Sequence, residues 1–313
     1  MTSAARGDPA IQASGLTRRF GEFVAVDGID LSVERGELFS LLGTNGAGKT
    51  TTIRMLCCLL RPSAGSATIL GHDIQGDPLA VKRVIAISPQ ETAIAAHLDA
   101  WENLSLMAGL HGVPKDRARP RSDELLEVMA LTGRAKEQAR KYSGGMQRRL
   151  SIAMALVSDP EVLFLDEPTI GLDPQSRRGM WEYIEGLKGD TTIVLTTHYL
   201  EEADALADRI GIIDAAEMVA LGTADELKAG ISDGPATVVE AAGMTSEGIA
   251  ALRQIYPDVR AIEGGVEIEA AEVDVYAVGD RLRPLGIAIE STYQRRVTLD
   301  DVFLELTGKA LRE

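Results

Sequence analysis

The stretch GTNGAGKT, at Gly43–Thr50, decides the fold expected for this chain of 313 residues. It satisfies the phosphate-loop pattern G-x-x-x-x-G-K-[ST], follows the apolar run Leu38–Leu42 and precedes a helical pattern. Glycines let such a loop turn tightly with its amides inward, and the helix N-terminus adds partial positive charge. The stretch therefore predicts a phosphate site between a buried strand and a helix.

The polar residues of this loop have separate expected roles. Lys49 should reach the β- and γ-phosphates of a nucleoside triphosphate, and Thr50 should ligate Mg²⁺. A glycine-rich turn with a solvated lysine is the alternative, and the flanking strand and helix count against it. The full set expected around the nucleotide is Gly43, Thr44, Asn45, Gly46, Ala47, Gly48, Lys49, Thr50 and Thr51.

A second motif, VLFLDE at Val162–Glu167, consists of four apolar residues followed by two acidic residues. Because buried strands of such sheets present their carboxyl ends to a ligand, Asp166 suits Mg²⁺, directly or through water. Glu167 suits orienting or deprotonating an attacking water. The alternative is a strand followed by a solvated acidic turn. Together the two motifs predict a nucleoside triphosphatase or kinase.

Strand-type and helical segments alternate through residue 230, which predicts an α/β fold with a parallel sheet and right-handed crossovers. Strands are expected at Ile11–Arg19, Phe23–Val26, Ile29–Val33, Leu38–Leu42, Ala67–Leu70, Val162–Leu165, Thr192–Leu195 and Ile210–Ile213. Helices are expected at Ser122–Leu131, Gly145–Leu156, Pro174–Lys188 and Leu200–Ala207.

The composition changes near residue 231, where ISDGP at Ile231–Pro235 is expected to be a linker. Strands at 237–240, 259–262, 266–269 and 288–293, with helices at 246–255 and 273–282, then predict a small α+β domain of βαββαβ order. A last helix should start at Thr298, where TLDD forms a capping box. The expected domains are residues 1–230 and 231–313.

Composition excludes several other classes of protein. The net charge of −15 argues against broad, non-specific binding of DNA or RNA. The longest uncharged stretch, Asn103–Pro114, is shorter than the roughly 20 apolar residues of a spanning helix. The N-terminus, MTSAARGDPA, lacks the apolar core of a signal peptide. The adjacent Cys57 and Cys58 have no metal-ligand spacing, so buried packing on a helix in a reducing, cytoplasmic setting is expected.

The motif YSGGMQRR, at Tyr142–Arg149, has paired glycines after Ser143 at the start of a helical pattern. Its backbone amides and the Ser143 hydroxyl would form an anion site. In this order of motifs the sequence resembles the ATP-binding-cassette (ABC) ATPases, whose signature has the form [LY]SGGQ; here Met146 replaces the glutamine. Over roughly residues 9–230, the resemblance implies a P-loop cassette with a parallel-sheet core, an antiparallel β subdomain and a helical subdomain at about 92–157.

Three further motifs carry the resemblance. Gln90 in ISPQE resembles the glutamine loop, which contacts Mg²⁺ or water and senses a transmembrane partner. Asp173 in GLDP resembles the residue carried across the dimer interface, and it also suits a helix N-cap. His198 in LTTHYLEEAD resembles the switch histidine that hydrogen-bonds the γ-phosphate. A generic loop glutamine and a buried core histidine are the alternatives for the first and third.

The comparison also covers two phenylalanines near the start of the chain and the histidines outside the motifs. Phe20, in RRFGEFVAVD, matches the aromatic that stacks on adenine in this family, and Phe23 is a competing candidate. A core aromatic is the alternative. His72, His97 and His111 match no motif and are expected to be structural or to lie at the surface.

The segments Asp99–Gly112, Asp166–Pro174, His198–Ile210 and Thr298–Gly308 resemble the drug-exporter branch of the family, of the daunorubicin-resistance type. This resemblance implies an ATP-hydrolysing subunit, with ATP and Mg²⁺ as cofactors, that powers export of a drug, antibiotic or lipid-like compound. Lys49, Glu167 and His198 would be its catalytic residues, and Thr50, Gln90 and Asp166 would hold Mg²⁺.

The same resemblance implies two kinds of partner, and the acidic charge argues against nucleic acid as a third. In a homodimer, Ser143, Gly144, Gly145 and Asp173 of one subunit would cover ATP held by the other, because a two-fold axis makes the contacts reciprocal. The second partner would be a separate integral-membrane permease, with this chain peripheral on the cytoplasmic face of the membrane. Trp101, Leu104, Leu106 and Met107 could dock to it or instead pack the helical subdomain.

Two other functions compete with export. A soluble ABC ATPase acting on ribosomes or nucleic acid is disfavoured, because the chain has one cassette, no long coiled coil and an acidic charge. In the other, a regulatory or dimerisation role of residues 231–313 would dominate.

Overall fold

In the computed structural model, which describes residues 8–231, 236–270, 272–295 and 297–308, the apolar runs of the sequence form a central sheet. Its strand order is β10-β9-β3-β8-β7-β6, and all neighbours are parallel except the edge pair β9 and β10. The strands are β3 (Leu38–Gly43), β6 (Ile85–Ser88), β7 (Val162–Asp166), β8 (Thr192–Thr197), β9 (Arg209–Asp214) and β10 (Glu217–Gly222). Strands β3, β7 and β8 are buried throughout, as continuous apolar runs predict.

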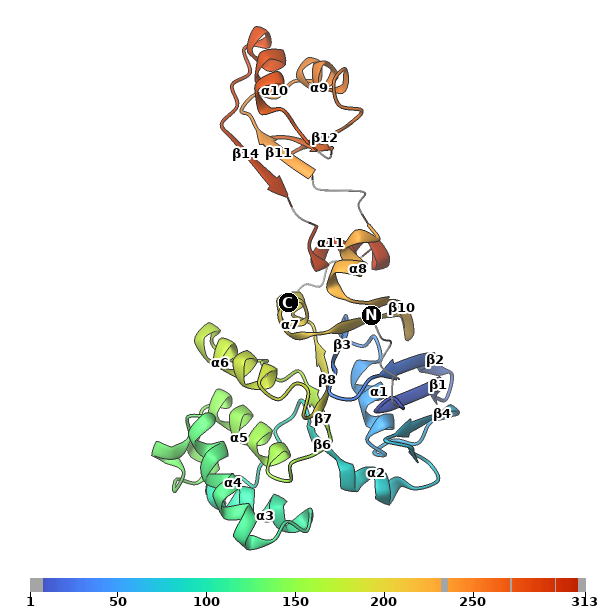
Figure 1. Ribbon diagram of the computed structural model, residues 1–313, viewed down its shortest axis with the longest axis vertical. Helices are drawn as coiled ribbons and strands as arrows, with labels where there is room; N and C mark the ends of the chain where they lie inside the picture. Colours follow the sequence, from blue (N-terminus) through green and yellow to red (C-terminus); the bar gives the residue numbers. More distant parts are fainter. Residues whose placement is uncertain (1–7, 232–235, 271, 296, 309–313) are drawn as a thin grey trace, which may run out of the picture. The chain divides into compact units, whose positions relative to one another are not determined.

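Alternate residues of the central strands enter two different cores. In β7, Leu163 and Leu165 pack with the helices α3 (Ala100–Leu110), α4 (Lys115–Val128), α5 (Gly144–Leu156) and α6 (Pro174–Glu185). Phe164 faces the other way, toward α1 (Lys49–Leu56) and α2 (Pro78–Val84). Figure 1 shows these two groups of helices on opposite sides of the strands. The remaining helical elements here are α7 (Leu200–Leu206), η1 (Thr132–Arg134) and η2 (Ala139–Lys141).

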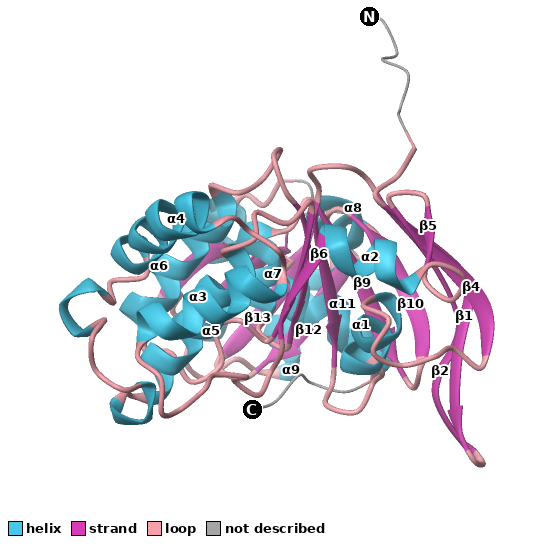
Figure 2. Ribbon diagram, turned by 90° about the horizontal axis from the view of Figure 1, so that it is seen from below, coloured by secondary structure: helices cyan, strands magenta, loops and turns pink. Residues whose placement is uncertain are grey.

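A second, antiparallel sheet has the order β2-β1-β4-β5 and forms its own layer (Figure 2). Its strands are β1 (Ile11–Phe20), β2 (Phe23–Val33), β4 (Ala64–Ile69) and β5 (His72–Asp73). The two strands predicted within 23–33 are one, because Asp27 and Gly28 together oppose Thr17 in a bulge. A bulge adds a residue without ending a strand, and Gly28 takes the required positive φ of 62°.

The prediction for the helix before residue 131 is wrong at both ends. Helix α4 begins at Lys115 and continues through Pro120, which has no N–H to donate within the helix. The helix continues because Ala118, Leu125 and Leu126 are buried, and such packing outweighs one lost hydrogen bond. The helix ends before Ala130, which has a φ of 52°.

Burial separates the candidate docking residues of the helical subdomain. Leu104 is completely buried in α3, so for this residue the alternative of packing inside the helical subdomain is confirmed. Trp101 and Met107 are half-buried and pack on the same core, whereas Leu106 is 46% exposed. Leu106 is therefore the most exposed of the four.

The two cysteines follow α1 rather than lie within it. Cys57 caps the helix and is buried, and burial raises the pKa of its thiol. Cys58 is half-buried, and both are free thiols. The predicted packing role is thus confirmed for Cys57, at a position just past the helix end.

The chain divides into two compact units after Ala224, and the second has its own antiparallel sheet of order β12-β13-β11-β14. Its elements are α8 (Ala224–Ala229), β11 (Ala236–Glu240), α9 (Ser246–Arg253), β12 (Asp258–Ile262), β13 (Gly265–Glu269), α10 (Val275–Leu282), η3 (Arg283–Leu285), β14 (Ser291–Arg295) and α11 (Leu299–Thr307). Helices α9 and α10 pack on one face of this sheet (Figure 1). The predicted βαββαβ order is confirmed.

Two details of this unit bear on the sequence predictions. Thr298 and Asp301 form the expected capping box at the start of α11. The expected linker lies outside the described residues, except for Ile231. The predicted domain boundary at residue 230 stays a prediction; the compact units divide six residues earlier.

Candidate functional site

The loop between β3 and α1 accepts only glycine at two positions. A Cβ on Gly43 would lie 2.4 Å from the carbonyl oxygen of Ile213. Gly48 has a φ of +116°, and a Cβ there would lie 2.6 Å from the carbonyl oxygen of Ala25. The loop is therefore held close to two neighbouring backbone segments, with Gly48 leading into α1.

Lys49 is buried in this loop. Its Nζ donates to the carbonyl oxygens of Gly43 at 2.7 Å and Thr44 at 3.3 Å. It also lies 3.7 Å from Oε1 of Glu167. Burial lowers the pKa of Lys49, while the carboxylates of Glu167 and Asp166 oppose that shift. The loop thus presents one cation that its own carbonyls and one carboxylate hold in place.

Asp166 accepts hydrogen bonds from two hydroxyl groups, one on α1 and one on β8. Its Oδ1 accepts from Thr50 at 3.2 Å and from Thr196 at 2.5 Å. The parallel pairing of β7 with β8 brings Thr196 opposite Asp166. We did not predict Thr196; its signal was its place directly after the strand predicted at 192–195 and two residues before His198.

Glu167 connects Lys49 with His198. Its Oε2 lies 2.6 Å from Nδ1 of His198, a distance at which the imidazole N–H donates to the carboxylate. Its backbone has a φ of 54°, which is rare for a residue other than glycine, and its N–H donates to the carbonyl oxygen of Thr196 at 3.1 Å. The structure therefore brings the three predicted catalytic side chains together, with the buried Glu167 carboxylate between Lys49 and His198.

A cavity of about 420 Å³ opens in front of these groups. Its lining comprises Phe20, Phe23, Ala25, Thr44, Asn45, Gly46, Gly48, Lys49, Thr50, Thr51, Gln90 and Glu167. Gly43 and Ala47 lie buried behind the loop surface. Both candidate adenine-stacking rings, Phe20 and Phe23, line the cavity, and the Arg18 guanidinium lies 4.4 Å from the ring centre of Phe20.

The predicted cross-dimer residues do not line this cavity. Ser143 is exposed and caps α5, accepting from the Met146 N–H at 3.3 Å. Gly144 and Gly145 follow it at the same helix end. Asp173 is exposed and caps α6, and hydrogen bonds from Ser176 lower its pKa. The N-cap interpretation of Asp173 is confirmed; Ser143, Gly144 and Asp173 are exposed, whereas Gly145 is half-buried.

The oxygen atoms around the loop fit a magnesium ion. Mg²⁺ prefers hard oxygen ligands, usually one or two carboxylates together with phosphate oxygens. The Thr50 hydroxyl and the Asp166 carboxylate already meet, and Gln90 lines the same cavity. Within the described residues no group of three His, Cys, Asp or Glu could hold a metal alone, so bound phosphate would have to complete the set.

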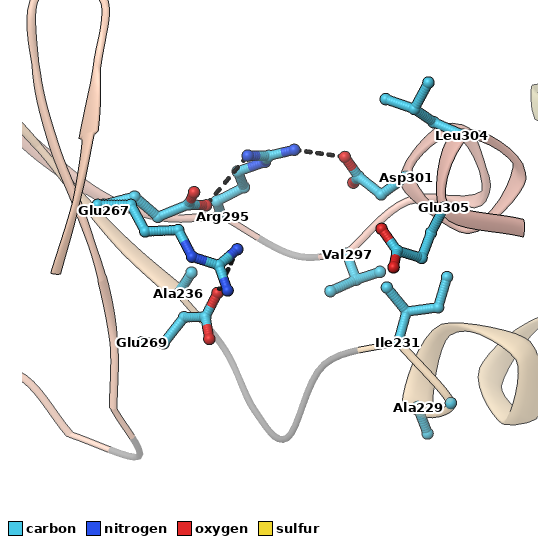
Figure 3. A pocket seen from close by; sticks show the side chains of 12 residues that line it. Ala229, Ile231, Ala236, Glu267, Glu269, Arg295, Val297, Asp301, Leu304 and Glu305 are labelled. Atoms are coloured by element: carbon cyan, nitrogen blue, oxygen red, sulfur yellow. Dashed lines mark hydrogen bonds and ion pairs between the residues drawn. The ribbon is translucent and has the colours of Figure 1, made fainter. Parts of the chain in front are cut away.

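A second cavity, of about 460 Å³, lies in the C-terminal unit (Figure 3). Its two arginines are already paired: Arg260 with Glu269 at 3.1 Å, and Arg295 with both Glu267 and Asp301. Glu305 adds a further carboxylate to the lining. Acidic side chains therefore outnumber cations, which disfavours a phosphate ligand here.

Glu202 is a buried carboxylate that we did not predict, although it lies in the quoted motif LTTHYLEEAD. Trp181 donates from Nε1 to its Oε1 at 3.0 Å. Burial raises the pKa of Glu202; the Thr197, Thr169 and Trp181 side chains oppose the shift, and the charge of Glu167 adds to it. Glu202 is therefore one of the buried residues that support the site.

Glu202→Gln is expected to stabilise the protein more at pH 8 than at pH 5. The unfolded carboxyl ionises near its ordinary pKa of 4.5, whereas the folded one keeps its proton to higher pH, so stability falls as pH rises between the two. Glutamine cannot ionise and escapes this loss. Thermal melting at both pH values measures it, with the exposed neighbour Glu201 changed to Gln as control. An equal Tm difference at the two pH values would contradict the expectation.

This phosphate loop, the acidic strand end and the parallel sheet define a P-loop nucleoside triphosphatase. The family model described as "ABC transporter" matches residues 26–170. With the relatives given next, this match shows that the chain belongs to the ABC transporter family of ATP-binding proteins. The resemblance seen in the sequence is thereby confirmed.

Several relatives match nearly the whole chain. The daunorubicin resistance ATP-binding protein DrrA3 of Streptomyces coeruleorubidus is 45% identical, over 96% of each chain. The linearmycin resistance ATP-binding protein LnrL of Bacillus subtilis is 37% identical, over 97% of this chain and 100% of its own. The Nod factor export ATP-binding protein I of Ralstonia nicotianae is 36% identical, over 97% and 96%.

Two solved structures share the cassette fold. The ATP-binding subunit of an ABC transporter has a TM-score of 0.66 and 28% identity, over 71% of this chain and 92% of its own. A dimeric ATP-binding cassette in a post-hydrolysis state, bound to ADP and Pi, has a TM-score of 0.62 and 25% identity, over 68% and 98%. The fold class expected from the sequence is therefore confirmed.

Proposed function

We propose that this protein hydrolyses Mg-ATP to drive export through a separate transmembrane subunit. The observation that carries the proposal is the buried Glu167 carboxylate, which lies between Lys49 and His198 at the edge of the loop cavity. Residues 1–230 would form the ATP-binding domain and residues 231–313 an accessory domain.

Nucleotide binding would use the loop and one aromatic ring. Backbone amides of the loop and the partial charge of the α1 N-terminus would bind the phosphates, with Lys49 as the cation at the β- and γ-phosphates. Phe20 or Phe23 would stack on the adenine. Magnesium, held by Thr50, Asp166 and Gln90, would offset phosphate charge.

Hydrolysis would depend on the geometry of Glu167. Its carboxylate accepts the proton of a water that attacks the γ-phosphate, or orients that water. The bond to His198 holds the carboxylate toward the imidazole, so that the ring lies beside the reacting group. His198 would then contact the γ-phosphate through its remaining nitrogen.

Closure of the site would require a second copy of the chain. Ser143, Gly144, Gly145 and Asp173 are available at two exposed helix starts, and a two-fold axis would bring them over the partner's nucleotide. The solved relative with ADP and Pi is a dimer. Loss of the γ-phosphate would remove contacts made only in the closed pair and so favour opening.

The names of the relatives support a proposal about the cargo. Their names give drug resistance and export, so we propose a drug, antibiotic or lipid-like cargo. Among the described residues no helix is both long and apolar enough to cross a bilayer. A separate permease would supply the pathway, with this chain peripheral on the cytoplasmic face of the membrane.

The test is the size of the Glu167→Gln variant with and without Mg-ATP, measured by light scattering on a sizing column. A shift from monomer to dimer only with Mg-ATP is the expected result, because ATP bound but not hydrolysed would hold both copies. Lys49→Ala in the same background should stay monomeric. A dimer that persists without nucleotide would contradict closure by ATP and assign the contact to another surface.

A further inference from the structure

Arg148 is a buried cation whose hydrogen bonds all go to backbone carbonyls. It is 2% exposed and follows the signature glycines in α5. Its Nη1 donates to the carbonyl oxygens of Pro89 at 2.5 Å and Gln90 at 3.4 Å. Its Nε donates to Pro168 at 3.1 Å, and its Nη2 donates to Asp166. Burial lowers the pKa of Arg148 to about 10, so it stays charged at neutral pH.

These four carbonyls belong to two separate parts of the site. Pro89 and Gln90 form the loop after β6 that reaches the cavity. Asp166 and Pro168 flank Glu167, so the arginine binds the peptide oxygens on both sides of that residue. Glu167 itself has a φ of 54°, a conformation that persists only where its surroundings hold it.

We propose that Arg148 is a positioning residue that sets the direction of the Glu167 carboxylate and couples it to the glutamine loop. The inference rests on the hydrolytic role proposed for Glu167. A planar guanidinium can serve both parts at once because its donors point in fixed, divergent directions. A lysine ammonium at the same place is a point charge that cannot reproduce this fork.

The position of Arg148 also links Glu167 to the start of α5. Arg148 lies four positions after Gly144, about one helical turn further along the same helix. A displacement of the Ser143–Gly145 end therefore moves the guanidinium and the carbonyls that it holds. Through this arginine, contact at the exposed signature would change the place of the buried Glu167.

The experiment is a double-mutant cycle on the full chain with Arg148→Lys and Glu167→Gln. Arg148→Lys alone should lower kcat at least ~10-fold, because the misplaced carboxylate costs turnover. The Kd for ATP should change less than about 2-fold, since the lysine lies outside the nucleotide cavity. In the Glu167→Gln background the same change should cost no further turnover, because the group that Arg148 positions is already gone.

The adjacent Arg149 is the matched control. It also donates to a carbonyl, that of Met129 at 2.8 Å, but it contacts neither Glu167 nor the glutamine loop. Arg149→Lys should leave kcat within about 2-fold, the scatter expected of a distant substitution. Rates are referred to nucleotide-binding sites measured by titration, so that a partly unfolded preparation still gives a valid kcat. Arg148→Gln, which keeps one amide donor, serves where Arg148→Lys does not fold.

Each result decides between definite alternatives. Losses that multiply in the double variant overturn the positioning role, because Arg148 would then act independently of Glu167. Unchanged kcat in Arg148→Lys, or a loss confined to ATP affinity, overturns it as well. Full turnover in Glu167→Gln alone overturns the proposed role of Glu167 and this inference with it, so the two failures are distinguishable.

Discussion

Glu167→Gln is expected to bind ATP normally and to lose at least ~10²-fold in turnover, since a positioned general base contributes about that much. The amide keeps the size of the carboxylate but cannot accept a proton from water. It also removes the charge that faces Lys49 at 3.7 Å and His198 at 2.6 Å. Steady-state phosphate release and equilibrium ATP binding measure the two quantities separately.

Glu161→Gln is the control for this change. Glu161 is exposed and directly precedes β7, so the variant removes one carboxylate near the same strand without touching the cavity. Its turnover should equal that of the unaltered protein. If Glu167→Gln also kept full turnover, Glu167 would not be the base, and the mechanism proposed above would be wrong.

Lys49→Ala is expected to weaken ATP binding roughly 10- to 100-fold, the effect of losing a charged hydrogen bond of about 1.5–3 kcal/mol. The variant removes the one cation that the loop presents to the phosphates. It also leaves Glu167 buried without its nearest positive neighbour, which adds repulsion toward the anionic nucleotide. Titration with a fluorescent ATP analogue measures the affinity.

Arg54→Ala provides the comparison for Lys49→Ala. Arg54 is an exposed cation in the last turn of the same helix, α1. Its removal changes the net charge equally but leaves the loop intact, so ATP affinity should stay within about 2-fold. Native affinity in Lys49→Ala would contradict the assignment of the phosphate site.

Most strands could be predicted because each buried run carries its own signal. The runs at 38–42, 162–165 and 192–195 are mostly apolar and do not alternate with charged residues, as a strand covered on both faces requires. Strand β6, at Ile85–Ser88, was missed because it begins directly after α2, with no turn residue to separate the two. The start of α4 was missed because Pro120 argues locally against a helix that distant packing supports.

The residues that support the site could not be assigned from the sequence. Arg148 and Glu202 stand within quoted motifs, yet their letters do not reveal which atoms they contact. Thr196 looked like an ordinary strand residue until the pairing of β7 with β8 placed it against Asp166. Their roles depend on register and burial, which are properties of several segments together.

By itself, the sequence determined the phosphate loop, the acidic strand end, the family and the βαββαβ order of the C-terminal unit. Each of these depends on residues near one another in the chain, through glycine geometry, apolar periodicity and helix caps. Only the tertiary structure decided that Lys49, Glu167 and His198 meet, that Leu104 is inaccessible and that Arg148 holds both sides of Glu167. Those contacts join residues 18 to 118 positions apart, and chain folding alone brings them within hydrogen-bond reach.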